Sequence, residues 1–396
     1  MREQTHKNNL PKICLISAVP GTIFFYRELI VHLKSVGAQV GVAASDMPRL
    51  YELKNHLGCK IFPVEISRRI TPLRDLVSIV KLSYYFRREK YDIVHAHTPK
   101  GGFIGMMSAF LGGISHRVYT VHGLLLGTAT GLKRKSFWVA ELLSCKLATE
   151  VLAVSPSLRK CVVEEKLCPA EKIKVLCDGT ACGINLRKFE PSEKTTQFGK
   201  QTREKLNIPE DAIVIGFVGR ITPDKGIETL VDGFLKLQQQ TANVYLLLIG
   251  RIETIRESLN QQTMDTINSN DNIHCTGHVK NTVPFYAAMD LVVLPSRREG
   301  FGLSLAEAGA MGLPTIATRV TGCVDAVVDN VTGLMVDVND ELQLAEAMLK
   351  LARNTGLRNK LGRQGRERVK KLFDSKRLVA EHMALYKRIL SKKQDC

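Results

Sequence analysis

The stretch AIVIGFVGRITPDKGIETLVDGF, residues 212–234, decides the fold class. An apolar, β-branched run leads through glycine into a stretch with helical periodicity. The same order recurs in PSRREGFGLSLAEAG, residues 295–309, which extends the apolar run at 291–295. A strand that passes through a glycine turn into a helix is the repeating unit of a doubly wound parallel sheet. These residues therefore predict an α/β fold.

Apolar runs alternate with helical patterns along most of the chain. In the first half the runs occupy residues 13–19, 38–44, 59–65, 92–96, 117–121 and 150–154. In the second half they occupy residues 212–219, 244–250, 272–277, 291–295, 314–318 and 333–337. This pattern predicts two doubly wound, Rossmann-like domains. We expect them to face a central cleft, since ligands bind at the carboxyl ends of parallel strands.

The predicted domains cover residues 1–190 and 205–375. Residues 186–204 are charged and lack an apolar period, which is typical of a linker. Three closing segments, 341–355, 357–373 and 376–391, have helical patterns. We expect the last helix, within residues 376–396, to pack back on the N-terminal domain.

The charge of the chain is unevenly distributed. Residues 1–200 contain 30 Lys and Arg against 16 Asp and Glu, and residues 201–396 contain 26 against 23. The first half therefore carries +14 of the total +17. Such an excess indicates an anionic partner: a membrane surface, a diphosphate or a nucleic acid. Nucleic acid is the weakest of these, because no helix-turn-helix, RNP or zinc pattern occurs.

Targeting signals and metal-binding cysteine patterns are not found in the sequence. No uncharged apolar run of about 18 residues is present, and the first twelve residues are polar, so we expect a cytoplasmic protein. The ten cysteines form no C-x-x-C pair, which favours reduced thiols and argues against a zinc site.

Two cations bracket the turn of the first quoted stretch. A fixed pair such as Arg220 and Lys225 suits a leaving diphosphate that no metal neutralises. Taken singly, Arg220 or Lys225 is more often a solvated surface charge.

Two carboxylates accompany the second quoted stretch. Glu299 lies in the loop and Glu307 about two turns into the following helix. A carboxylate can accept hydrogen bonds from both hydroxyls of a ribose, as the acidic residue of dinucleotide sites does. The alternative is structural: Ser304 caps the helix and Glu307 completes an S-x-x-E capping box.

GRITPDKG together with the spacing Glu299-x7-Glu307 resembles the retaining GT-B glycosyltransferases of family GT4. VHAHTPKGGFIG (94–105), YTVHGL (119–124), DGTACGINLRKF (178–189) and TGCVDAVVDNVTGLMV (321–336) follow in family order, so the resemblance covers nearly the whole chain. It is greatest to bacterial enzymes that extend capsule, O-antigen or glycoprotein-glycan precursors.

The resemblance implies roles for individual residues. Arg220 and Lys225 would bind the donor diphosphate and Glu307 the ribose. Glu299 would bind the transferred sugar and phosphate, together with the backbone of Phe301, Gly302 and Leu303.

The N-terminal domain supplies two further residues by the same resemblance. His122 would contact the transferred sugar, and Gly21, alone where many relatives have two glycines, would lie near the donor phosphate. For His97 two roles remain open, structural support or contact with the acceptor.

The resemblance also implies the reaction. It is transfer of a sugar, expected to be an N-acetylhexosamine from a UDP-sugar, to a saccharide on a polyprenyl diphosphate. No cofactor is expected, and no metal, because no D-x-D triplet occurs. Front-face attack, with the leaving phosphate taking the acceptor proton, would retain the anomeric configuration. The alternative on the same fold is a sugar-nucleotide epimerase.

Two basic, apolar segments predict peripheral contact with the inner face of the cytoplasmic membrane. In residues 67–90, Leu73, Leu76, Val77, Val80 and Tyr84 recur at helical spacing beside basic residues. Residues 123–143 combine LLL, KRK and Trp138, the only tryptophan. The alternative is that each segment is a helix packed on its own sheet.

Overall fold

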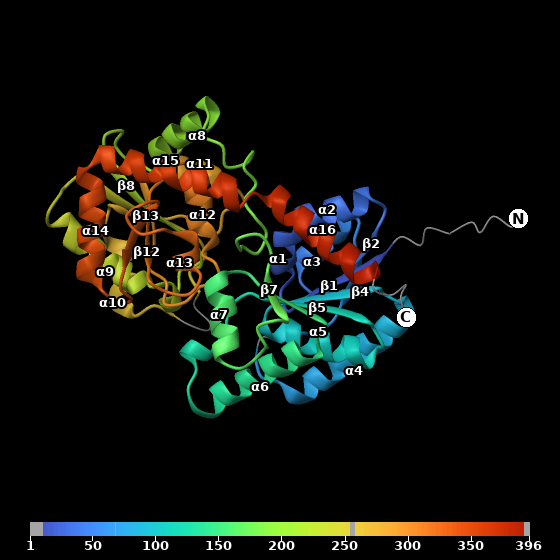
Figure 1. Ribbon diagram of the computed structural model, residues 1–396. Helices are drawn as coiled ribbons and strands as arrows, with labels where there is room; N and C mark the ends of the chain where they lie inside the picture. Colours follow the sequence, from blue (N-terminus) through green and yellow to red (C-terminus); the bar gives the residue numbers. More distant parts are fainter. Residues whose placement is uncertain (1–10, 68, 254–257, 392–396) are drawn as a thin grey trace, which may run out of the picture. The chain divides into compact units, whose positions relative to one another are not determined.

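The chain forms two compact units, each built on one parallel sheet (Figure 1). The computed structural model describes residues 11–67, 69–253 and 258–391. Unit 1 joins Met1–Cys182 to Lys376–Cys396, and unit 2 is Gly183–Ser375. The doubly wound α/β architecture predicted from the sequence is confirmed in both units.

Unit 1 contains a seven-stranded sheet in the order β3-β2-β1-β4-β5-β6-β7. Its strands are β1 (Lys12–Ser17), β2 (Gln39–Ala44), β3 (Lys60–Pro63), β4 (Ile93–His97), β5 (His116–Val121), β6 (Glu150–Ala153) and β7 (Ile173–Val175). The winding direction reverses between β1 and β4, where Ser17 pairs with His97 at the carboxyl ends. Ligands of open α/β sheets bind at such a reversal.

Unit 2 contains a six-stranded sheet in the order β10-β9-β8-β11-β12-β13. Its strands are β8 (Ile213–Val218), β9 (Val244–Ile249), β10 (Ile273–Cys275), β11 (Leu291–Leu294), β12 (Thr315–Thr318) and β13 (Gly333–Val336). The reversal lies between β8 and β11. The first stretch that indicated the fold class contains β8, and the second follows β11 directly.

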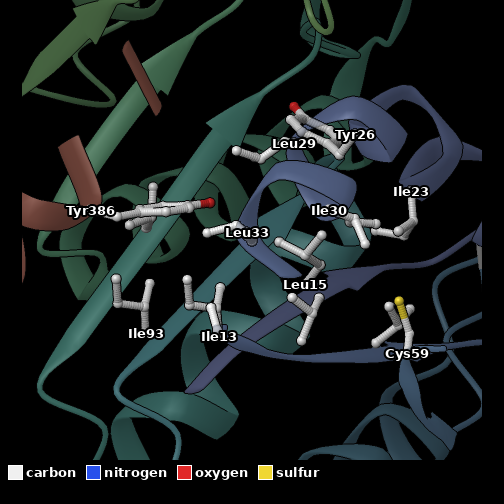
Figure 2. Packing of buried hydrophobic residues seen from close by; sticks show 14 of the residues in the cluster. Ile13, Leu15, Ile23, Tyr26, Leu29, Ile30, Leu33, Cys59, Ile93 and Tyr386 are labelled. Atoms are coloured by element: carbon white, nitrogen blue, oxygen red, sulfur yellow. The ribbon is translucent and has the colours of Figure 1, made fainter. Parts of the chain in front are cut away.

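Helices cover both faces of the unit 1 sheet (Figure 1). One face carries α1 (Pro20–Ile23), α2 (Arg27–Ser35), α3 (Pro48–Leu57) and α16 (Ser375–Ser391). The other carries α4 (Pro72–Glu89), α5 (Pro99–Leu111) and α6 (Gly131–Leu147), and α7 (Pro156–Glu164) follows β6. Figure 2 shows strand residues such as Ile13 and helix residues such as Ile30 and Tyr386 in one core. The C-terminal helix is thus part of the N-terminal core.

Helix α4 turns an apolar face outward. Ile79, Leu82 and Phe86 are buried, whereas Leu73 is 81% exposed. The apolar face of α4 consists of Leu73, Leu76, Val77, Val80 and Tyr84, each more than half exposed. Helix α4 therefore packs on its own unit through one side, and the five residues of its apolar face lie on the exposed side.

The second basic segment packs more closely. Trp138 on α6 donates its indole N–H to the Glu165 carbonyl, 2.9 Å away, and Leu126 is buried. Leu132 remains 84% exposed at the start of the helix. No helix in the described part of the chain is long and apolar enough to cross a bilayer.

The stretch predicted as a linker, residues 186–204, contains most of a helix instead. The helices of unit 2 are α8 (Glu193–Lys205), α9 (Ile227–Gln238), α10 (Gln261–Ser269), α11 (Val283–Ala288), α12 (Leu303–Ala310), α13 (Cys323–Ala326), α14 (Glu341–Arg353) and α15 (Thr355–Leu372). Ser192 caps α8 by accepting from the Thr195 N–H at 3.3 Å. The helix packs on α11 through Gly199, where a Cβ would lie 2.3 Å from the Ala287 carbonyl oxygen. Close packing through glycine leaves no apolar stripe for a sequence pattern to reveal.

Candidate active site

Lys225 and Glu299 meet at the reversal point of unit 2. Lys225 ends the 3₁₀ turn Pro223–Lys225 after β8, and Glu299 lies in the loop after β11. Their Nζ and Oε1 atoms are 2.5 Å apart, and both side chains are largely buried. The hydroxyl of buried Ser296 donates to the same carboxylate oxygen at 2.8 Å. Two residues 74 positions apart are thus held as one charged pair.

Asp224 pairs with one further cation from each of these two loops. Its Oδ2 lies 3.2 Å from Arg220 Nη2 and 3.4 Å from Arg298 Nη2, and Thr222 donates to its Oδ1. Burial raises the pKa of Asp224, but the Thr222 hydrogen bond and the cations outweigh it, so the net pKa is lowered. Arg220 is still 45% exposed, which leaves its guanidinium accessible to an anion.

Glu307 is held by a tyrosine from a neighbouring helix. Tyr286 on α11 donates its hydroxyl proton to Glu307 Oε2 at 2.8 Å. The pKa of Glu307 is raised overall, because burial outweighs the Tyr286 hydrogen bond and the Lys188 charge, which both lower it. The tyrosine thus fixes the orientation of the carboxylate through one oxygen, and the second oxygen is the one that we expect to accept from a ligand hydroxyl.

Helix α12 begins directly after the second glycine turn. Gly302 is the N-cap at φ 71°, so the N–H groups of Leu303 and Ser304 belong to the first helical turn, which has no intrahelical acceptors. Such a turn is suited to an anion. Phe301 is buried and contacts Phe373 edge-to-face at 4.9 Å, so only its backbone can serve a ligand.

The capping-box alternative is wrong. Ser304 lies inside α12, and no side chain of the described residues caps the helix. Glu307 is bound to Tyr286 rather than to the backbone at the helix start.

Gly226 fixes the distance between the two loops. It has φ 70°, and an added Cβ would lie 2.0 Å from the Pro295 carbonyl oxygen. We expect Gly226→Ala to lower the free energy of unfolding by at least about 3 kcal/mol and to reduce activity. Gly277 is the control, since its φ is 69° but nothing lies within 4 Å of the added Cβ. Gly277→Ala should cost only about 1–2 kcal/mol. Equal losses in urea-unfolding experiments would contradict this account.

Unit 1 holds the other two predicted residues. Gly21 lies in the four-residue helix α1 after β1, and an added Cβ would be 3.3 Å from Arg49 Nη1. His122 follows β5 and is partly exposed. Its Nε2 lies 3.2 Å from the Tyr26 hydroxyl and 3.4 Å from His97 Nδ1.

His122 is the exposed end of a buried histidine cluster. His97 is fully buried beside His122, a position suited to structural support. His95 binds the Tyr386 hydroxyl through Nδ1 and the Thr120 hydroxyl through Nε2, both at 2.7 Å. His382 also lies on α16, 6.1 Å from His95 between ring centroids. The cluster therefore joins α16 to the residue predicted to touch the sugar.

These histidines resist protonation. Burial lowers the pKa of His122 and of His382 to about 4. Burial, followed by the neighbouring histidines, lowers the pKa of His95 and His97 well below the ordinary value. His122 is consequently neutral near pH 7 and can offer a ligand hydrogen bonds but no charge.

We expect the stability of unit 1 to fall as the pH is lowered below about 6.5. There the unfolded chain takes up protons at the four histidines while the folded chain does not. Each contributes up to about 1.4 kcal/mol per pH unit down to its folded pKa. Glu141 acts oppositely, because burial raises its pKa to about 7 and its folded form therefore holds a proton in this range. His382→Asn should reduce the slope of the unfolding free energy between pH 6.5 and 5.

The control for this prediction is His32→Asn, since His32 lies exposed on α2. It should leave the pH slope unchanged. A His382→Asn slope equal to that of the wild type would show that the histidine cluster does not set the acid sensitivity.

Backbone strain marks two positions that the sequence patterns do not indicate. Thr98 follows His97 at φ 67°, and Thr180 has φ 83°. A β-branched residue in this region is strained by about 1–3 kcal/mol, and such strain concentrates at functional sites. Thr98 Oγ1 and His97 Nε2 are buried and have no hydrogen-bond partner in the described part of the chain. In the sequence, the turn at Thr98 was indicated only by the family resemblance of VHAHTPKGGFIG, residues 94–105.

Comparison with known proteins matches a glycosyltransferase family model in each unit. Residues 24–182 match the family described as "Glycosyltransferase Family 4", and residues 199–368 match "Glycosyl transferases group 1". The chain is 34% identical to the capsular polysaccharide biosynthesis glycosyltransferase CapM of Staphylococcus aureus, over 97% of this chain and 98% of that protein. It is 27% identical to UDP-Gal:alpha-D-GlcNAc-diphosphoundecaprenol alpha-1,3-galactosyltransferase of Escherichia coli, over 73% and 74% respectively.

Two solved structures have the same fold. A glycosyltransferase from Rickettsia africae superposes with a TM-score of 0.80 at 22% identity, covering 96% of this chain and 99% of that one. The Anabaena protein Alr3699/HepE, solved in complex with UDP and glucose, gives 0.79 at 19% identity with the same coverage. At these identities the likeness establishes the fold.

Proposed function

The chain belongs to glycosyltransferase family 4, and from that premise we propose that it transfers an N-acetylhexosamine from a UDP-sugar to a saccharide on a polyprenyl diphosphate. Its general activity follows from the family: it is a GT-B glycosyltransferase of the kind that acts in bacterial capsule and polysaccharide synthesis. What we propose beyond the family is the identity of the donor and the acceptor, retention of the anomeric configuration, and transfer without a metal.

The observation that carries the proposal is the joining of the two glycine-turn loops of unit 2. Lys225, Arg220 and the start of α12 supply positive charge at one place, beside Glu299. In the proposed reaction the bond between the sugar C1 and the diphosphate oxygen breaks, and the acceptor oxygen bonds to C1 on the same face. The acceptor proton passes to the leaving phosphate. Lys225 and Arg220 stabilise the charge that grows on that phosphate, so no metal is required.

The ribose and the transferred sugar have separate partners. Glu307 would accept from the ribose hydroxyls, oriented by Tyr286. Glu299 would accept from a hydroxyl of the transferred sugar while still paired to Lys225. His122, neutral at pH 7, would contribute a hydrogen bond to the same sugar.

A donor panel tests this proposal. UDP-, GDP- and ADP-linked sugars are incubated with a polyprenyl diphosphate-linked saccharide, with and without EDTA, and product is followed by mass spectrometry. We expect a UDP-N-acetylhexosamine to be used equally well with EDTA and the α-anomer to be formed. A preference for a GDP- or ADP-sugar would refute the proposed donor. Loss of transfer in EDTA would refute metal independence. Donor epimerised without acceptor would support the epimerase alternative.

Peripheral membrane binding is supported by the apolar face of α4. Exposed apolar side chains beside basic ones favour insertion into an anionic surface. We expect the protein to float with phosphatidylglycerol vesicles at low salt and to dissociate at about 1 M salt. Leu73→Asp should reduce the bound fraction several-fold. Leu342→Asp is the control, because Leu342 is also more than half exposed but lies on α14 of unit 2. Equal binding of both variants would exclude α4 as the contact.

A further inference from the structure

A groove of about 690 Å³ lies in unit 1 between α4, α5 and α6. Its walls are mainly apolar and include Ile70, Leu76, Ile79, Phe103, Leu132 and Ala140. The volume is that of a small-molecule site, for which about 300–1,000 Å³ is usual. None of the residues assigned above to the sugar or the nucleotide lines it.

The groove continues into the apolar face of α4. Leu76 belongs to both, and Ile70 and Leu132, more than half exposed, also line the groove. Contiguous exposed apolar surface of this kind marks a binding site rather than ordinary solvent-facing structure. A ligand could therefore pass from a lipid surface into the groove without crossing polar protein.

The charges around the groove select the ligand. Arg69 and Lys135 are exposed and line it, while Asp75 in its wall is paired with Lys100. Glu141, the other carboxyl group, has its pKa raised to about 7 by burial, partly offset by the Tyr119 hydrogen bond. The groove thus combines an apolar interior, neutralised carboxyls and two accessible cations.

A second copy of this chain does not suit such a surface. It would bring another Arg69 and another Lys135 toward the first pair, and like charges across an interface oppose association. A hydrocarbon chain that ends in an anionic group matches both the interior and the cations.

We propose that this groove binds the isoprenoid segment next to the diphosphate of the lipid-linked acceptor, with Arg69 and Lys135 contacting the diphosphate. The proposal rests on the function proposed above and names where its acceptor lipid is held. The groove takes the first few isoprene units, and the remainder of a long chain stays in the bilayer.

Photo-crosslinking of the full-length protein tests this proposal. The probe is farnesyl diphosphate with a benzophenone at the far end of the chain, and labelled peptides are mapped by mass spectrometry. We expect label on residues 70–79, on Phe103 or on residues 132–143, and competition by long-chain polyprenyl phosphate. Phosphatidylglycerol at the same concentration should not compete. Label elsewhere, or equal competition by phosphatidylglycerol, overturns the proposal.

Two variants block the groove in different ways. Ala140→Trp fills it, and Leu132→Asp places a charge at an exposed wall position that does not threaten folding. Each should lower labelling at least about tenfold, the loss expected when about 1.4 kcal/mol of binding is removed. The controls are Ala380→Trp, at an exposed alanine of α16, and Leu342→Asp. Unchanged labelling in both groove variants contradicts the proposal.

Glu141 provides an independent readout through pH. The charged or titratable groups near it are Tyr119 on β5, Asp75 on α4, Lys100 on α5, and Cys145 and Lys135 on α6. Ionisation of Glu141 above pH 7 would place a carboxylate against the hydrocarbon, so labelling should fall from pH 6 to 8.5. Glu141→Gln can still accept from Tyr119 and should lose this component of the pH dependence. Identical pH profiles for the wild type and Glu141→Gln overturn the proposal.

Binding and transfer are measured separately. A protein that transfers sugar to the lipid acceptor but is not labelled in the groove contradicts this inference alone. A protein labelled in the groove that does not use the lipid acceptor supports the groove and contradicts the proposed function.

Discussion

Replacing Lys225 with alanine is expected to lower kcat for sugar transfer by about 10²–10³-fold or more, since one preorganised group at a developing charge contributes that much. The ammonium lies 2.5 Å from Glu299 Oε1, whereas Arg220 and Arg298 pair with Asp224, so no other cation occupies the position of Lys225 beside Glu299 among the described residues. Steady-state transfer at saturating donor, measured as UDP release, reports the loss.

The matched control is Lys360→Ala, an exposed lysine of α15 in the same unit. It should leave kcat unchanged. Lys225→Ala also leaves Glu299 without its cation, so Lys225→Ala, Glu299→Gln tests whether the loss is only that of an unbalanced carboxylate. Recovery of wild-type kcat in the double variant would show that Lys225 has no direct role in sugar transfer.

Glu307→Ala is expected to lower kcat/KM for the donor by about 10²–10⁴-fold, the loss of two hydrogen bonds to a charged group. The effect should appear mainly in KM, because the ribose lies away from the reacting bond. Tyr286→Phe should lower kcat/KM for the donor by less, since it removes the hydroxyl that orients the Glu307 carboxylate but leaves the carboxylate itself.

A modified donor makes this assignment specific. The wild type should bind a UDP-sugar with a 2′-deoxyribose less tightly than the ordinary UDP-sugar. Glu307→Ala should bind the two donors equally tightly, because this variant has already lost the hydrogen bond to the ribose 2′-hydroxyl. Glu346→Ala, at an exposed glutamate of α14, is the control for removing a charge from this unit. A deoxyribose effect of equal size in Glu307→Ala would place the ribose elsewhere.

Most of the fold could be predicted because its strands are short apolar runs between helical patterns. Two elements escaped for identifiable reasons. Strand β7 has only three residues, Ile173–Val175, and follows charged residues. Helix α8 packs through Gly199 and Thr202 rather than through large apolar side chains, so its sequence has the composition of a linker.

The candidate site is predictable where function depends on a local motif. The two glycine turns, with the family spacing around them, are enough to indicate Arg220, Lys225, Glu299 and Glu307. Their partners are not predictable in this way, because Asp224 binds a cation from a loop 74 residues away and Tyr286 belongs to another helix. The strained backbone at Thr98 is likewise invisible to composition.

The membership of α16 in the unit 1 core sets the order in which the protein can fold during synthesis. Leu385, Tyr386 and Ile389 share a core with strand residues from Ile13 to Leu152, which leave the ribosome long before α16. Unit 2 can therefore close before α16 is made, whereas the core of unit 1 is completed only after α16 has left the ribosome. Until then the incomplete core of unit 1 exposes apolar surface to chaperones and proteases. The unit that is synthesised first is therefore the last to complete its folding.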